Sequence, residues 1–127
     1  MMSEKAQRCF DQHKRYLALA NEIEQKLDND LGWACVVRFY AAVQLLNAYL
    51  IDKPNIRFDP VSSDHQKRKA VLERCPELRE APRKYRQLKD LSELVRYDAW
   101  HEFSQADYQN SLAYLAKIVA IVDPKMR

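Results

Sequence analysis

The sequence contains almost no glycine: Gly32 is the single one among 127 residues, beside five prolines. A sheet protein of this size needs glycine in the tight turns between strands, where positive φ angles occur. The scarcity argues against most β-rich folds and predicts an all-α protein.

Cysteine is also scarce. Cys9, Cys35 and Cys75 are odd in number and widely spaced, and no Cys-x-x-Cys pair occurs. This pattern argues against a disulfide framework or a zinc knuckle and is typical of reduced thiols in a cytosol. The three histidines do not have the spacing of metal ligands either, so we expect no metal and no other cofactor.

No long apolar run is free of polar residues. The most apolar stretch, residues 31–51, contains Arg38, Gln44 and Asn47, which favours a buried helix over a membrane span. The first five residues lack the apolar run of a signal peptide. We therefore expect a cytoplasmic protein without a membrane partner.

The charge balance is uneven along the chain. Hydrophobic residues make up 47% of the sequence and charged residues 31%, which is typical of one globular domain, here residues 1–127. The net charge is only +3, but residues 65–89 hold nine Lys/Arg against three Glu, a net +6 that leaves −3 for the rest. A basic segment of this kind guides a polyanion. Our candidate RNA-binding residues there are Lys67, Arg68, Lys69, Arg83 and Arg86; the alternative for each is a place on a solvated helix face.

Apolar residues at helical spacing predict five helices. The first spans about residues 3–28. The second spans about 31–51, with Asp30 as a plausible N-cap, and it is apolar almost all round. Such a helix belongs at the centre of a bundle, or between the core and a partner subunit.

The second half of the chain is predicted to hold three more helices. After a loop over residues 53–63, Ser63-Asp64-His65-Gln66 resembles a capping box that opens a short third helix, which stops before Pro76. A fourth helix begins near Leu78 and reaches about residue 97. The fifth begins at Ser104-Gln105-Ala106-Asp107 and ends at Asp123-Pro124. Tyr40 and Tyr85 are expected in the core, with hydroxyls that find polar partners.

Arg96 and His101 stand on either side of the junction between the fourth and fifth helices. Arginine binds phosphate through a planar fork of donors, and histidine transfers protons near neutral pH. Arg8 and His13 have the same separation, but they fall within one helix, where a five-residue step places side chains about 140° apart. The junction leaves Arg96 and His101 free to converge, which Arg8 and His13 cannot easily do.

Several short motifs between Trp33 and Ile118 occur together in a characteristic order. They are Trp33, Phe39-Tyr40-Ala41-Ala42, His65 with Arg68, Tyr85, Leu88, Leu91-Ser92 and Arg96-Tyr97. In this respect the chain resembles the small stand-alone prokaryotic proteins of the HEPN superfamily, whose ribonucleases carry an Arg-x(4–6)-His motif.

The resemblance implies an antiparallel bundle of four main helices plus one short helix. It also implies a homodimer whose two motifs face one cleft, and RNA cleavage without a metal. Carried onto this chain, the catalytic residues are Arg96 and His101. Two positions depart from the family pattern: Tyr97 replaces the polar residue that often follows the arginine, and Phe103 stands where members silenced by nucleotidylation have tyrosine.

The resulting hypothesis is a metal-independent endoribonuclease that acts on tRNA or mRNA by attack of the ribose 2′-hydroxyl. His101 moves the proton and Arg96 stabilises charge on the phosphate. The family suggests a toxin–antitoxin or phage-defence setting, with an antitoxin or accessory protein as a further partner. The alternatives are a non-catalytic dimeric module that binds RNA, a nucleotide or a protein, and an accessory subunit that contributes a dimer surface around residues 31–51.

Each candidate residue also has a structural alternative. Arg96 in a last helical turn complements the helix dipole, and His101 can be a partly buried loop histidine bonded to a backbone carbonyl. Trp100 is expected to anchor the junction or to stack on an RNA base. Asp98 either orients an imidazole or serves a tight turn, and His65 caps or packs near the third helix.

Overall fold

The computed structural model describes residues 1–27 and 30–127, and within these ranges every regular element is a helix and no strand occurs. The predicted all-α class is confirmed. The elements are α1 (Glu4–Lys26), α2 (Leu31–Ile51), α3 (His65–Leu72), the 3₁₀ turn η2 (Pro76–Leu78), α4 (Ala81–Tyr97), α5 (Gln105–Val122) and the 3₁₀ turn η3 (Asp123–Met126). The predicted end of the first helix at residue 28 lies outside the described residues.

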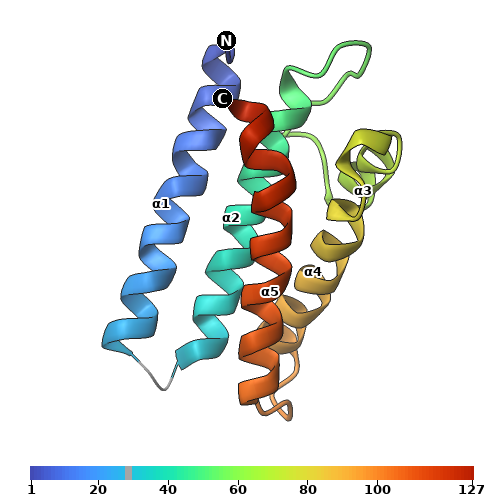
Figure 1. Cartoon of the computed structure of the whole chain (residues 1–127). Coiled ribbons are helices and arrows are strands. Elements are labelled where there is room, and N and C mark those ends of the chain that lie inside the picture. Colours follow the sequence, from blue (N-terminus) through green and yellow to red (C-terminus); the bar gives the residue numbers. More distant parts are fainter. Residues whose placement is uncertain (28–29) are drawn as a thin grey trace.

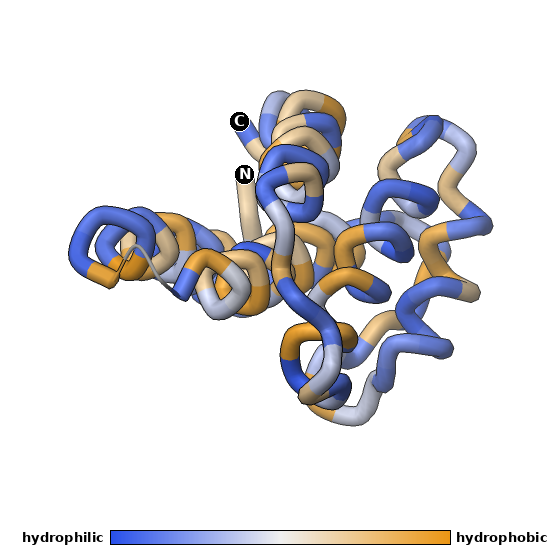
Figure 2. The backbone as a smooth tube through the Cα atoms, turned by 90° about the horizontal axis from the view of Figure 1, so that it is seen from below, coloured by the Kyte–Doolittle hydropathy of each residue, from blue (hydrophilic) through white to orange (hydrophobic). Residues whose placement is uncertain are grey.

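Helix α2 lies at the centre of the molecule because almost all of its faces are apolar. It packs against α1, α4 and α5. Figure 1 shows α1 at one edge and α3 at the other, with α2, α4 and α5 between them. Viewed from the end in Figure 2, the outer edge of α1 is hydrophilic. By length and composition α2 is apolar enough to cross a membrane, but 72% of its most apolar window is buried inside the protein, and core helices pass the same test.

The contact between α1 and α2 contains two buried polar residues. His13 is 2% exposed, and its Nδ1 lies 2.8 Å from the Ala41 carbonyl oxygen. Arg38 is 3% exposed and places Nη2 3.4 Å from Glu24 Oε2. Buried polar groups need such partners, so these two contacts fix how α1 lies along α2.

Local capping rules account for most helix ends. The predicted start of α5 is confirmed, and a capping box forms there: the Asp107 N–H donates to Ser104 Oγ at 3.0 Å, and the Ser104 N–H donates to Asp107 Oδ2 at 3.1 Å. The fifth helix also ends as predicted, since Val122 is its last residue. Asp30 precedes α2, but its side chain makes no capping bond.

Two predicted helix starts were wrong. The N-cap of α3 is Asp64, whose Oδ1 accepts from the Lys67 N–H at 2.8 Å, so the helix begins at residue 65 without a cap from Ser63. Helix α4 begins at Ala81, not near Leu78, because η2 and then Arg79, with φ 50° and ψ −116°, interrupt the chain first. Positive φ cannot be continued into an α-helix.

Candidate functional site

The α4–α5 turn connects the two predicted catalytic residues and lies at the end of the molecule away from both termini (Figure 1). Helix α4 ends at Tyr97, and Asp98 begins a tight turn. The Asp98 Oδ1 accepts from the Trp100 N–H at 3.0 Å, and its carbonyl accepts from the His101 N–H at 3.1 Å. Of the two roles considered for Asp98, the structure gives it the turn.

His101 is held by Asp107, a contact that the sequence did not predict. Its Nε2 lies 2.9 Å from Asp107 Oδ2, and the two side chains are 23% and 21% exposed. Burial would raise the pKa of Asp107, but hydrogen bonds from the Ser104 N–H and the His101 ring outweigh it and keep that pKa below its ordinary value. A carboxylate only accepts hydrogen bonds, so in the neutral form of the ring the proton is on Nε2, and Nδ1 bonds to none of the described residues.

Arg96 is held by aromatic residues and by its own helix. Its Nη1 donates to the Tyr40 hydroxyl at 2.8 Å, as expected for a core tyrosine, and its Nε donates to the Ser92 carbonyl at 3.4 Å. The guanidinium carbon lies 5.0 Å from the ring centroid of Tyr97 and 5.7 Å from that of Phe39. Cation–π contacts of this kind stabilise an arginine. Among the described residues Arg96 has no carboxylate partner.

The structure gives Arg96 and His101 different partners. No hydrogen bond or ion pair joins the two side chains in the described part of the chain. The first turn of α2 lies close to neighbours of both residues in the sequence: a Cβ on Gly32 would be 3.2 Å from Val95 Cγ1 and 3.5 Å from Phe103 Cγ. In the sequence Val95 directly precedes Arg96, and Phe103 follows His101 by two positions.

The other Arg-His pair is separated as predicted. Arg8 is exposed and bonds to Glu4 at 3.4 Å, whereas His13 is buried against α2. Burial lowers the pKa of His13, and the Ala41 carbonyl only partly compensates. This pair forms no phosphate site.

The predicted RNA-binding residues divide between surface and core. Lys67, Arg83 and Arg86 are exposed and Lys69 is half-buried, whereas Arg68 is only 4% exposed. Arg68 points into the core, since neighbouring residues on a helix face directions about 100° apart. It is therefore not part of a surface for RNA.

Trp100 differs from the expected anchor. It is 94% exposed and packs the junction with little of its surface. Of the two expected roles, only stacking on a base fits this exposure.

A second polar cluster lies between α2, α3 and α4, where the sequence suggested only packing for His65. Arg68 Nε donates to Asn47 Oδ1 at 2.8 Å, and its Nη1 lies 3.4 Å from the Tyr85 hydroxyl and 3.3 Å from His65 Nδ1. The Tyr85 hydroxyl is 2.8 Å from His65 Nδ1. The signal in the sequence was Asn47, a polar residue inside the otherwise apolar stretch 31–51; nothing distinguishes Arg68 from Lys67 and Lys69 beside it.

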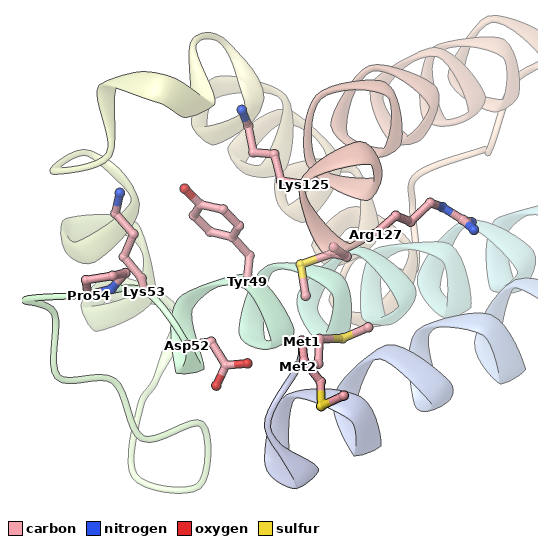
Figure 3. A pocket seen from close by; sticks show the side chains of 9 residues that line it. Met1, Met2, Tyr49, Asp52, Lys53, Pro54, Lys125 and Arg127 are labelled. Carbon is pink, nitrogen blue, oxygen red and sulfur yellow. The ribbon is translucent and has the colours of Figure 1, made fainter.

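Another pocket, of about 310 Å³, lies where the two ends of the described chain meet beside the end of α2 (Figure 3). Lys53, Lys125 and Arg127 line it together with Asp52. The Lys53 ammonium is already paired with Glu77 at 2.6 Å, and Tyr49 also donates to that carboxylate. These bonds lower the pKa of Glu77 to about 2. This ionic group contributes to the fold and leaves fewer charges for a ligand.

Within residues 1–27 and 30–127, no group of three or more His, Cys, Asp or Glu side chains is placed to hold a metal ion. Comparison with known protein families, curated proteins and solved structures gives no match for this chain.

Proposed function

We propose that this chain is a HEPN-type, metal-independent endoribonuclease of the cytoplasm that acts as a homodimer, with Arg96 and His101 as its catalytic residues. The observation that carries the proposal is the His101–Asp107 pair, 2.9 Å apart, on a solvent-reaching turn directly after Arg96. A carboxylate behind an imidazole fixes the orientation of the ring and leaves the second nitrogen for proton transfer.

The chemistry follows from these two side chains. Neutral His101 takes the proton of a ribose 2′-hydroxyl on Nδ1 as the 2′-oxygen attacks the adjacent phosphorus. The bond from phosphorus to the 5′-oxygen breaks, and that oxygen takes a proton from a protonated histidine. The products are a 2′,3′-cyclic phosphate and a 5′-hydroxyl. Arg96 Nη2, which has no partner among the described residues, donates to a non-bridging oxygen as its charge grows.

A homodimer supplies the two histidines that this scheme uses. One copy of the chain has a single His101, so the acid and the base come from two subunits facing each other. The large apolar side chains around the turn support this arrangement: Leu94 is 37% exposed, Tyr97 76% and Trp100 94%. Exposed apolar groups gathered in one region favour a protein interface. The proposed dimer has an antiparallel helical bundle of the HEPN type in each subunit.

The test is cleavage of 5′-labelled tRNA and mRNA in EDTA. We expect His101→Ala and Arg96→Ala each to lower the rate at least about 100-fold. Arg8→Ala is the matched control, since it removes an exposed arginine from α1. Mass spectrometry should find 2′,3′-cyclic phosphate ends. Wild-type rates in both variants, or a rate that falls in EDTA, would refute the proposal.

A non-catalytic dimeric module that binds RNA, a nucleotide or a protein is the second candidate. It is favoured by one observation: Arg96 is tied to Tyr40 and His101 to Asp107, without a contact between them. The same incubation separates the two candidates. RNA binding that weakens with added salt, without any cleaved product, supports the module.

A further inference from the structure

A small basic pocket lies on the other half of α4, facing the start of α3. Its volume is about 200 Å³, and its lining includes His65, Lys69, Tyr85, Arg86, Lys89 and Asp90. Drug-sized ligands occupy pockets of roughly 300–1,000 Å³, so this pocket fits one small group better than a whole nucleotide. Lys89 is seven residues before Arg96, about 10 Å along the helix axis.

Behind the pocket lies a buried positive charge without a counter-ion. Arg68 is 4% exposed, and its hydrogen-bond partners in the described part of the chain are the neutral groups of Asn47, Tyr85 and His65. A buried cation that no anion compensates is costly. Tyr85 and His65 connect this guanidinium to the pocket, so an anion bound there would lie one side chain away from it.

His65 presents a donor to the same pocket. The Arg68 N–H can only donate, so His65 Nδ1 accepts and the ring proton of the neutral imidazole is on Nε2. Nε2 has no partner among the described residues. Burial first, and then the charges of Arg68, Lys89 and Arg96, lower the pKa of His65 against the opposing effect of Glu93. The imidazole therefore lies in a positive field.

The acidic groups near the pocket do not cancel this field. Asp90 is exposed at its rim, and Glu93 is paired with Lys89 at 2.8 Å. Lys69 in turn lies 3.9 Å from Glu73, whereas Arg86 and the buried Arg68 have no carboxylate partner among the described residues. Several cations and an N–H donor around a small volume match the charge and the acceptor oxygens of a tetrahedral oxyanion.

We propose that the pocket between His65 and Lys89 binds a phosphate group. The site is separate from the α4–α5 turn and needs no RNA cleavage there. The phosphate can come from a free or terminal phosphomonoester or from an RNA backbone. Lys69, Arg86 and the His65 Nε2–H contact its oxygens, while Arg68 acts behind them by holding His65 and Tyr85.

The test is an NMR titration of the full chain with inorganic phosphate at pH 7.5, in chloride buffer of constant ionic strength. With three histidines in the chain, the His65 ring signals can be assigned by comparison with His65→Gln. We expect these signals to shift with saturation in the wild type. In Lys69→Ala/Arg86→Ala the apparent Kd should rise at least about tenfold.

The matched control is Lys5→Ala/Arg15→Ala, which removes the same charge from exposed positions on α1. All four substituted side chains reach solvent, so both variants should fold, and far-UV circular dichroism checks this. Equal phosphate affinity in the two double variants would overturn the proposal. So would an absence of saturable shifts at His65.

Two RNA oligonucleotides of one sequence, with a 5′-phosphate and with a 5′-hydroxyl, identify the source of the phosphate. A terminal phosphate is the ligand if only the phosphorylated RNA competes with inorganic phosphate. A backbone phosphate is the ligand if both compete equally and Lys69→Ala/Arg86→Ala weakens both. If inorganic phosphate binds at His65 but neither RNA displaces it, the ligand is a free phosphate or a small phosphomonoester.

Discussion

The buried pair of Arg68 and Asn47 provides a sharp energetic test of the polar cluster. The hydrogen bond from Arg68 Nε to Asn47 Oδ1 is 2.8 Å long, and both residues are less than 5% exposed. Asn47→Leu keeps a side chain of similar size but removes the best acceptor of a buried cation. Arg68→Met removes the cation but leaves the buried Asn47 amide without its donor.

The expected magnitudes differ between these changes. Leaving a buried charged donor without its hydrogen-bond acceptor costs about 3 kcal/mol or more. Arg68 keeps longer contacts to His65 and Tyr85, at 3.3 and 3.4 Å, so we expect Asn47→Leu to cost about 3 kcal/mol, at the lower end. Arg68→Met should cost about 1–3 kcal/mol, the penalty of an unsatisfied buried amide. The double variant should cost less than Asn47→Leu alone, because neither an unpaired charge nor an unpaired amide remains.

Urea unfolding followed by far-UV circular dichroism in a phosphate-free buffer measures these free energies. The double-mutant cycle should give a coupling of at least about 2 kcal/mol. Asn110→Leu on the exposed surface of α5 is the control and should change stability by less than about 0.5 kcal/mol. Arg68 is not the buried and coupled cation described above if the stability loss of the double variant equals the sum of the losses in the two single variants. The same conclusion follows if Asn47→Leu costs under about 1 kcal/mol.

Two further predictions concern pH and backbone geometry. Burial lowers the pKa of both His13 and His65, so the unfolded chain binds more protons than the folded one as the pH falls through about 6.5. The urea midpoint should therefore drop between pH 7.5 and 5.5, and it should drop less in His13→Gln/His65→Gln. An unchanged wild-type midpoint would contradict this prediction. Arg79 has φ 50° and ψ −116°, a region that glycine occupies without strain, so Arg79→Gly should raise the free energy of unfolding by about 1 kcal/mol. Asn55→Gly, at φ 66°, should change it by only a few tenths of a kcal/mol since asparagine tolerates that region; equal effects at the two positions would refute the strain at Arg79.

Sequence rules worked best where the physics is local. The start of α5 depends on Ser104 and Asp107, three positions apart, and it was found at its predicted place. The start of α3 shows the limit of such rules, because Ser63 and Asp64 can both cap a helix and in the structure Asp64 is the cap. The early break before α4 depends on the backbone of Arg79, which no side-chain pattern reveals.

The site residues were harder to predict because their contacts are long-range. Lys67, Arg68 and Lys69 look alike in the sequence, but Arg68 alone meets Asn47, 21 residues earlier. The Tyr40–Arg96 contact joins residues 56 positions apart. Even the short His101–Asp107 contact was missed, because Asp107 was already explained as a cap. One carboxylate oxygen serves both purposes.

The close approach at Gly32 brings the first turn of α2 against residues on both sides of the α4–α5 turn. A methyl group there would press on Val95, whose two methyl carbons would be 3.2 and 3.3 Å away, and would make an ordinary contact with Phe103 at 3.5 Å. A hydrogen atom stands where every other amino acid would place a carbon, so the start of α2 packs this closely on the residue before Arg96 without displacing it.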